Sequence, residues 1–235
     1  MPRQLKSSEL KKERAKDNMD YLMFYSMSQN PFDKAISTII QTVDYKGLTF
    51  RLKYLTETLG FGLVTGRPGT GKTVILHEFA NQLDPNQYHV SYLPLSTETF
   101  GDFYHQMATS IGIESAYRKS AKFKQLQERI SEMHDIERVT PVFIIDEAQY
   151  LTGQIFNELI LITNFGMDMQ KKCAVILSGL PVIAQQLQRP QFEAFCQRLT
   201  VNYQVIGLEP DEAADYVLPK FRSAGVEATL SMKRP

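Results

Sequence analysis

One eight-residue stretch constrains the fold of this chain more than any other feature. Residues 66–73 read Gly-Arg-Pro-Gly-Thr-Gly-Lys-Thr and fit the pattern G-x-x-x-x-G-K-[ST] at every fixed position. An apolar run at 61–64 precedes the pattern, and apolar residues at helical spacing follow it. The sequence therefore predicts a strand, a glycine-rich turn and a helix, the context in which this pattern binds phosphate groups.

The chemistry of this loop predicts a nucleoside triphosphate as the ligand. Its three glycines let the backbone curl so that N–H groups point at phosphate oxygens, and the helix start adds the positive end of its dipole. Lys72 is expected to reach the β and γ phosphates, and Thr73 to offer its hydroxyl to Mg²⁺. The predicted cofactors are thus ATP and Mg²⁺. The predicted nucleotide-binding residues of the loop are Gly66, Arg67, Pro68, Gly69, Thr70, Gly71, Lys72 and Thr73.

Composition limits the class of protein. With 235 residues and 43% hydrophobic content, the chain can bury a substantial core. Its 26 basic residues balance 26 acidic ones, so contact with nucleic acid would need a local patch. No apolar run approaches a membrane span, and no apolar signal segment follows the charged N-terminus. Cys173 and Cys196 form no C-x-x-C pair and are expected to be buried thiols. We therefore expect a cytoplasmic protein without membrane contact.

Strand-like and helix-like segments alternate along the chain. Residues 1–20 are polar and basic, and they are predicted to form an arm that is mobile or partner-dependent, or else a plain solvated tail. The alternation that follows predicts an α/β fold with a parallel sheet covered by helices. Strands are expected at 61–65, 88–95, 141–145, 174–178 and 201–206, and helices at 47–59, 71–83, 99–111, 119–134, 153–163, after Pro181 and at 211–224.

A second, acidic motif follows the predicted strand at 141–145. Asp146 and Glu147 would lie at the carboxyl end of a buried strand, where open α/β sheets place their ligand crevice. Asp146 is expected to orient Mg²⁺ through its water shell, and Glu147 to polarise the water that attacks the γ phosphate. Alone, such an acidic strand end is a weak signal. Together with the phosphate loop it predicts an ATP hydrolase.

Four segments taken together resemble one family. They read TGRPGTGKT, PVFIIDEAQYL, LITNFGMDMQKKCAVILSGLP and FCQRLTVNYQVIGLEPDEAADYV. They are similar to the AAA+ ATPases of the ExeA-like and transposition-regulator group, which includes the Mu B and TniB type transposon helper ATPases. The opening YLMFYSMSQNPFDKAI is similar as well, so the likeness covers about residues 20–225. It implies a P-loop NTPase of AAA+ type, with a parallel sheet between two helical layers and an ATPase core at 21–225.

The resemblance implies two further site residues. Arg198 matches the arginine that reaches the γ phosphate of a neighbouring subunit, where it stabilises transition-state charge. Ser178 matches the polar position that senses the γ phosphate. From the residues alone, an ordinary surface arginine packed beside Phe195 is the favoured interpretation of Arg198. The family usually continues into a helical lid with a second sensing arginine, and we expect that lid to be largely absent, with 226–235 as its remnant and Arg234 as a poor substitute.

Three functions are compatible with these observations. The first is a homo-oligomeric ring or filament that assembles on double-stranded DNA and directs a transposase to its target. The second is a secretion-assembly ATPase of ExeA type, and the third is a nucleotide-dependent interaction switch without hydrolysis, against which Glu147 argues. Phosphate contacts to DNA would come from a basic cluster, which is otherwise a solvated helix face. Its members are Arg118, Lys119, Lys122 and Lys124.

Two other groups of residues are assigned structural roles. The four histidines are scattered without metal-ligand spacing, so no zinc site is predicted. Aromatic and apolar residues recur at helical spacing in the segment 99–111, and we expect them to lie in the core rather than to stack against bases. These are Phe100, Phe103, Tyr104 and Met107.

Overall fold

The structure is a computed structural model that describes residues 22–32, 40–94, 99–114, 119–167 and 169–226. The described residues divide into two compact units, one within Val43–Gly207 and the other made of the described residues before Val43 together with 208–226. The predicted arm at 1–20, and all but the first residue of the predicted lid remnant, lie outside the described residues. The domain boundaries drawn from the sequence therefore stay a prediction.

The larger unit is built on a parallel sheet. Among the described residues it has five strands in the order β2-β3-β4-β1-β5, and every pairing is parallel. The phosphate loop follows β1 and the acidic motif ends β3, so the two strands that carry the motifs lie on either side of β4. The strands are β1 (Gly60–Gly66), β2 (Tyr88–Pro94), β3 (Thr140–Asp146), β4 (Ala174–Gly179) and β5 (Leu199–Val205).

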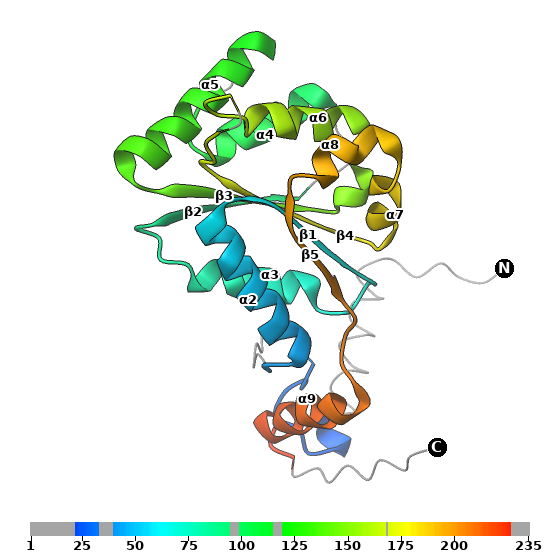
Figure 1. Cartoon of the computed structure of the whole chain (residues 1–235). Helices are drawn as coiled ribbons and strands as arrows, with labels where there is room; N and C mark the ends of the chain where they lie inside the picture. The colour runs from blue at the N-terminus through cyan, green and yellow to red at the C-terminus, as the bar shows by residue number, and fades with distance from the viewer. Residues whose placement is uncertain (1–21, 33–39, 95–98, 115–118, 168, 227–235) are drawn as a thin grey trace, which may run out of the picture. The chain divides into compact units, whose positions relative to one another are not determined.

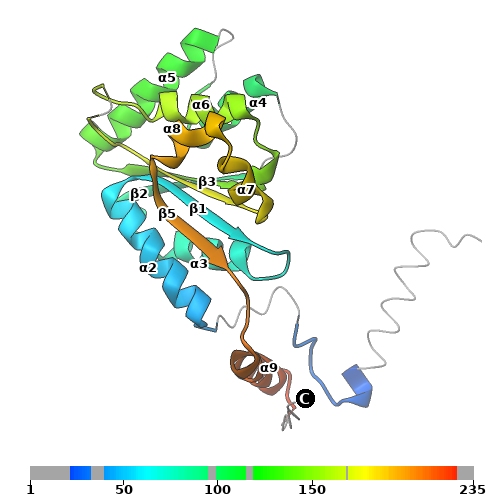
Figure 2. The same ribbon diagram turned by 45° about the vertical axis from the view of Figure 1, so that its right-hand side comes forward.

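Helices cover both faces of this sheet, as the views in Figure 1 and Figure 2 agree. One face carries α2 (Val43–Thr58) and α3 (Lys72–Gln82). The predicted α/β fold is thus confirmed, although α2 begins four residues before the predicted helix at 47–59. No helix in the part of the chain that the structure describes is long and apolar enough to cross a membrane. The other face carries α4 (Phe100–Ser110), α5 (Lys119–Glu132), α6 (Gly153–Ile162), α7 (Val182–Leu187) and α8 (Glu193–Cys196).

The main core lies between the sheet and the face that carries α4 to α8. Phe103, Tyr104 and Met107 are fully buried there, which confirms their predicted core role. An aromatic cluster fixes α8, since the ring of Phe195 packs against Phe61 at 4.8 Å and against Phe156 at 4.9 Å between centroids. Such aromatic pairs add stability beyond the area that they bury. The chain that enters β5 is therefore held firmly.

The two cysteines are free thiols that differ in burial. Cys173 is buried as predicted, and burial raises the pKa of its thiol to about 12. The predicted burial of Cys196 is wrong, because this residue is only partly covered and lines an open cavity of about 660 Å³. The reason is its place in a four-residue helix beside the edge strand β5. Its Sγ donates to the carbonyl oxygen of Leu187 at 3.1 Å.

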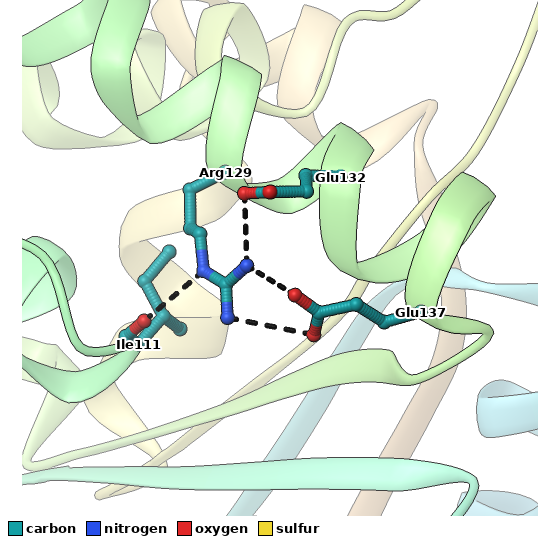
Figure 3. A network of polar contacts seen from close by, with 4 residues as sticks. All are labelled: Ile111, Arg129, Glu132 and Glu137. Carbon is teal, nitrogen blue, oxygen red and sulfur yellow. Dashed lines mark hydrogen bonds and ion pairs between the residues drawn. The ribbon is translucent and has the colours of Figure 1, made fainter.

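Arg129 organises the passage from α5 to β3 (Figure 3). The helix predicted to end near residue 134 instead changes to a π-helical turn, Met133–Glu137. The Arg129 guanidinium donates to Glu132 at 2.9 Å and to Glu137, and its Nε donates to the carbonyl oxygen of Ile111 at 3.4 Å. The hydrogen bonds that Arg129 donates to Glu137 and then to Glu132 raise the pKa of Arg129. One side chain thus links the ends of α4, α5 and the π-helical turn.

The smaller unit joins segments from both ends of the described chain. Its helix α9 (Pro210–Ser223) agrees with the helix predicted at 211–224. The backbone N–H and the hydroxyl of Ser28 both donate to the carbonyl oxygen of Ala224, at 2.9 and 3.1 Å. The rings of Phe32 and Phe221 meet edge to face at 5.8 Å. The segment before residue 32 therefore packs on α9 within this unit.

Candidate nucleotide-binding and catalytic site

The phosphate loop has the predicted strand–loop–helix geometry. It leaves β1 at Gly66 and enters α3 at Lys72. Gly69 and Gly71 have φ values of +80° and +91°, a left-handed conformation that residues with a side chain rarely adopt. Gly66 is needed for a different reason, because a Cβ there would lie 2.7 Å from the carbonyl oxygen of Val205. The first N–H groups of α3 have no acceptor within the helix, which leaves them available to an anion.

Lys72 folds back onto its own loop. Its ammonium donates to the carbonyl oxygens of Gly66 at 2.7 Å and Arg67 at 3.0 Å. Burial lowers the pKa of Lys72, and the charges of Asp146 and Glu147 oppose that shift. The lysine and both acidic residues therefore act on one another electrostatically, so the structure brings the two sequence motifs together at one edge of the sheet.

Asp146 is buried at the carboxyl end of β3, where two donors hold its carboxylate. Tyr92, on the neighbouring strand β2, donates its hydroxyl to Oδ2 at 2.7 Å. The backbone N–H of Glu147 donates to Oδ1 at 2.9 Å. Burial and then the hydrogen bond to Asp146 raise the pKa of Tyr92, so its hydroxyl stays protonated as a donor. The carboxylate is thus fixed as an acceptor at the position predicted for the Mg²⁺-orienting residue.

Glu147 lies beside Asp146 but is exposed to solvent. Its backbone is left-handed, with φ +54°, which is uncommon for a residue other than glycine and is often found at functional sites. A short 3₁₀ turn, Ala148–Tyr150, follows. The side-chain amide of Gln149 donates to Oε2 of Glu147 at 2.5 Å. The sharp turn therefore places two adjacent carboxylates in different surroundings, one buried and one exposed.

Ser178 lies on β4, between the two strands that carry the motifs. In the β1 ladder it pairs with Val64. The side chain is completely buried, and its hydroxyl has no hydrogen-bond partner among the residues that the structure describes. A buried hydroxyl without a partner costs free energy and calls for an explanation. The structure thus places Ser178 near the carboxyl edge of the sheet, and its phosphate-sensing role stays a prediction.

Arg198 lies away from this site. It immediately precedes β5, whose first residue, Leu199, pairs with Phe61 at the start of β1. The phosphate loop begins at the other end of the same strand, where Gly66 pairs with Val205. With a rise of about 3.3 Å per residue, five steps separate the two ends by about 17 Å. Within one chain, Arg198 therefore lies at the amino end of the parallel strands, and the phosphate loop lies at their carboxyl end.

The basic cluster predicted to contact DNA is largely engaged with the protein itself. Lys119 pairs with Glu158 at 2.8 Å, and Lys124 with Glu128 at 3.6 Å. Lys122 donates to the carbonyl oxygen of Gly101 at 3.3 Å. The fourth member, Arg118, lies outside the described residues. Two of the three described lysines therefore have their charge offset by a carboxylate, and the cluster is less basic than its sequence indicates.

Three residues around the site had no signal in the sequence analysis. Tyr92 and Gln149 hold the two acidic residues, as described above. The third is Asp44, in the first turn of α2, where an acidic residue normally indicates only a favourable helix start. Its carboxylate accepts from the backbone N–H groups of Ile206 and Gly207 at 2.8 and 2.9 Å. Gly207 packs beside the phosphate loop, since a Cβ there would lie 3.6 Å from Thr70. Asp44 thus fixes the chain that supports the loop.

Comparison with known proteins agrees with this geometry. A family model described as an AAA domain matches residues 55–187, more than half of the chain. The chain belongs to this AAA domain family. General secretion pathway protein A of Aeromonas hydrophila is 28% identical over 212 residues, which cover 87% of this chain and 38% of that protein. The AAA domain chain thus spans well under half the length of this curated relative.

Solved structures share the fold of this AAA domain. Cdc6p from Pyrobaculum aerophilum superimposes with a TM-score of 0.64 at 16% identity, over 82% of this chain and 53% of that one. The ORC2 protein of Aeropyrum pernix in its ADP form gives 0.60 at 14% identity, over 82% and 56%. The predicted P-loop NTPase fold of AAA+ type is therefore confirmed. The finer assignment to Mu B and TniB type helpers stays a prediction.

Proposed function

We propose that this AAA domain binds ATP with Mg²⁺ and hydrolyses it. The proposal is carried by one observation: the parallel strands β1 and β3 flank β4 and end, at the same edge of the sheet, in the phosphate loop and in the acidic pair Asp146 and Glu147. The groups present suit the nucleotide, since the loop offers N–H donors and an ammonium to phosphate. Thr73 and Asp146 offer the oxygen ligands that Mg²⁺ prefers, and the bound ion would offset the negative charge of the phosphates.

The residues of the chain divide the chemical work. The loop N–H groups hold the phosphates, while Lys72 exchanges its contacts with Gly66 and Arg67 for phosphate oxygens. Glu147 takes a proton from the attacking water as the bond from the water oxygen to the γ phosphorus forms. The bond between the γ phosphorus and the bridging oxygen breaks, and ADP leaves with that oxygen. Positioning and charge stabilisation suffice for this reaction.

A second copy of the chain is proposed to complete the site. Arg198 is about 17 Å along the sheet from the phosphate loop of its own chain, as the strand register shows. Packing of Phe195 against Phe61 and Phe156 holds the chain just before it. An arginine on a rigid edge suits contact with a neighbour's γ phosphate. The proposed active form is therefore a homo-oligomer.

The similarity to General secretion pathway protein A favours a role in secretion over the other candidates, because it extends over 87% of this chain. Hydrolysis would then drive an assembly step on envelope proteins. A cytoplasmic location is proposed on the free thiols, which persist in a reducing compartment.

The second candidate is a transposition helper that assembles on double-stranded DNA and directs a transposase. It rests on the resemblance of the motif segments to that group, and the pairing of Lys119 and Lys124 with carboxylates weakens it. Filter binding to duplex DNA at several salt concentrations, with and without ATP, separates the candidates. A helper should bind only with ATP, without sequence preference and with a linear log–log salt dependence. No binding at low salt would favour the secretion role.

Hydrolysis itself is tested by phosphate release from ATP, measured with Mg²⁺ and with excess chelator. The proposal expects release that requires Mg²⁺ and rises with oligomer formation. Tight nucleotide binding without any release would instead support the third candidate, a nucleotide-dependent interaction switch.

A further inference from the structure

Gln149 connects two parts of the candidate site. It lies in the 3₁₀ turn after the acidic motif, and its side-chain nitrogen donates to Oε2 of Glu147 at 2.5 Å. Its side-chain oxygen accepts the backbone N–H of Leu180 at 3.0 Å. Leu180 follows β4 directly, two residues after Ser178. One amide thus joins the carboxylate proposed as the base to the turn between β4 and α7.

The space for this amide depends on a glycine. A Cβ at Gly179 would lie 2.6 Å from Oε1 of Gln149 and 3.3 Å from the backbone nitrogens of Ala148 and Gln149. The φ of Gly179 is not in the left-handed region, so close approach alone explains the glycine. The N–H of Leu180 also decides how the amide is oriented, because only the oxygen end can accept it. The amino end must then face Glu147.

We propose that Gln149 is a positioning residue that holds the Glu147 carboxylate for attack by water and ties it to the β4–α7 turn. The proposal rests on the proposed role of Glu147 as the base. Glu147 is exposed, so its side chain would otherwise sample several rotamers, and ordering it costs conformational free energy. The Gln149 amide is held by Leu180 and confined by Gly179, so it orders the Glu147 carboxylate before the nucleotide binds. Groups that are preorganised in this way raise reaction rates.

Two substitutions separate this role from a purely structural one. Gln149→Met keeps the length of the side chain and removes both hydrogen bonds. Gln149→Glu keeps an acceptor for the Leu180 N–H but places a second carboxylate against Glu147 in place of the donor. If Gln149 only stabilised the turn, Gln149→Glu would hydrolyse ATP normally. The positioning role expects both variants to be slow. Gln185→Met, on the exposed face of α7, is the matched control.

The kinetic signature should be a loss of kcat without a loss of affinity. Fluorescent-nucleotide titration is expected to give a Kd within about two-fold of wild type for both variants. Phosphate release under saturating ATP should fall about ten- to a hundred-fold, part of the roughly 10²–10⁴ that a general base contributes. In a Glu147→Gln background, Gln149→Met should cause no further loss, because residues that act as a unit are not additive. Gly179→Ala should reproduce the loss by displacing the amide.

Each result decides between the two proposals. If Glu147→Gln hydrolyses ATP at the wild-type rate, the proposed role of Glu147 fails, and the positioning role fails with it. If Glu147→Gln is slow while Gln149→Met and Gln149→Glu retain normal kcat, only the positioning role is overturned. Additive losses in the double variant overturn it as well. Thermal melts identify a variant that does not fold, and Gln149→Glu, which keeps the Leu180 contact, then carries the test.

Discussion

The ammonium nitrogen of Lys72 lies 2.7 Å from the carbonyl oxygen of Gly66, the first residue of its own phosphate loop. Together with the bond to Arg67, this contact satisfies part of a partly buried charge. A phosphate group would offer the same ammonium stronger, charge-assisted hydrogen bonds. Exchange of carbonyl for phosphate contacts therefore couples nucleotide binding to the shape of the loop.

Lys72→Ala removes the side chain that makes this exchange. We expect ATP affinity to fall at least about 100-fold, since hydrogen bonds to charged groups contribute roughly 1.5–3 kcal/mol each and at least two are lost. The fold should persist, because the lysine contacts only its own loop in the described hydrogen bonds. Fluorescent-nucleotide titration measures the affinity, with Lys53→Ala on the exposed side of α2 as control. Wild-type affinity in Lys72→Ala would refute the phosphate-loop assignment.

Glu147→Gln keeps the shape of the proposed base and removes its charge. Nucleotide binding should be unchanged, while phosphate release should fall by about 10²–10⁴, the usual contribution of general base catalysis. The variant should also accumulate as an ATP-bound oligomer, which size-exclusion chromatography would detect. Glu57→Gln, exposed on α2, serves as control. A rate equal to wild type would place the base elsewhere.

Tyr92→Phe tests the support of the buried carboxylate. The change removes the 2.7 Å hydrogen bond to Asp146 and little else, because the ring is conserved in shape. Loss of a group that orients a metal-binding residue typically costs ten- to a hundred-fold in metal affinity or activity. We expect the Mg²⁺ concentration for half-maximal hydrolysis to rise by about ten-fold, with a normal rate at saturating Mg²⁺. Tyr54→Phe, at an exposed tyrosine, is the control and should leave the Mg²⁺ titration unchanged. An unchanged Mg²⁺ titration in Tyr92→Phe would contradict a role for Tyr92.

The phosphate loop and the order of strands and helices could be predicted because their signals are local. A glycine pattern, a buried apolar run and a helical period each involve neighbouring residues. The supporting contacts could not be predicted for the opposite reason. Tyr92 reaches Asp146 across 54 residues of sequence, and Gln149 reaches Leu180 across 31. Only the register of β2, β3 and β4 brings these partners together.

The basic cluster shows that charge pairing, too, depends on contacts that are distant in sequence and cannot be predicted from one segment. The sequence displays lysines close together at 119–124, but it does not show that Glu158 lies 2.8 Å from Lys119. The partner comes from α6, 39 residues away. A count of charges along one segment therefore overstates the positive potential that a helix presents. The prediction that Cys196 is buried was wrong for a related reason, because apolar neighbours in sequence do not reveal that β5 is an edge strand.

Arg198 joins the chemistry of one chain to the assembly of several. Its guanidinium donates a 2.9 Å hydrogen bond to the carbonyl oxygen of Ala194. It lies at the amino end of the parallel strands, away from the phosphate loop of its own chain. If it enters a neighbour's site, Arg198→Ala should leave ATP binding nearly unchanged, since the contact forms across the interface and chiefly in the transition state. Hydrolysis should fall by roughly 10³–10⁵, the value of an arginine finger. Arg198→Lys should stay slow, because lysine lacks the planar fork.

Mixing two inactive variants gives the decisive form of this test. A Lys72→Ala chain binds ATP only weakly but still carries Arg198, whereas an Arg198→Ala chain binds ATP but lacks the arginine. At an interface where the first chain donates to the second, one intact site is restored. The mixture should therefore hydrolyse ATP although neither variant does so alone, and the recovered rate should rise with protein concentration through the range where oligomers form. Activity of Arg198→Ala alone at the wild-type rate, or a mixture as inactive as its components in an oligomer of mixed composition, would leave Arg198 as a packing residue at the start of β5.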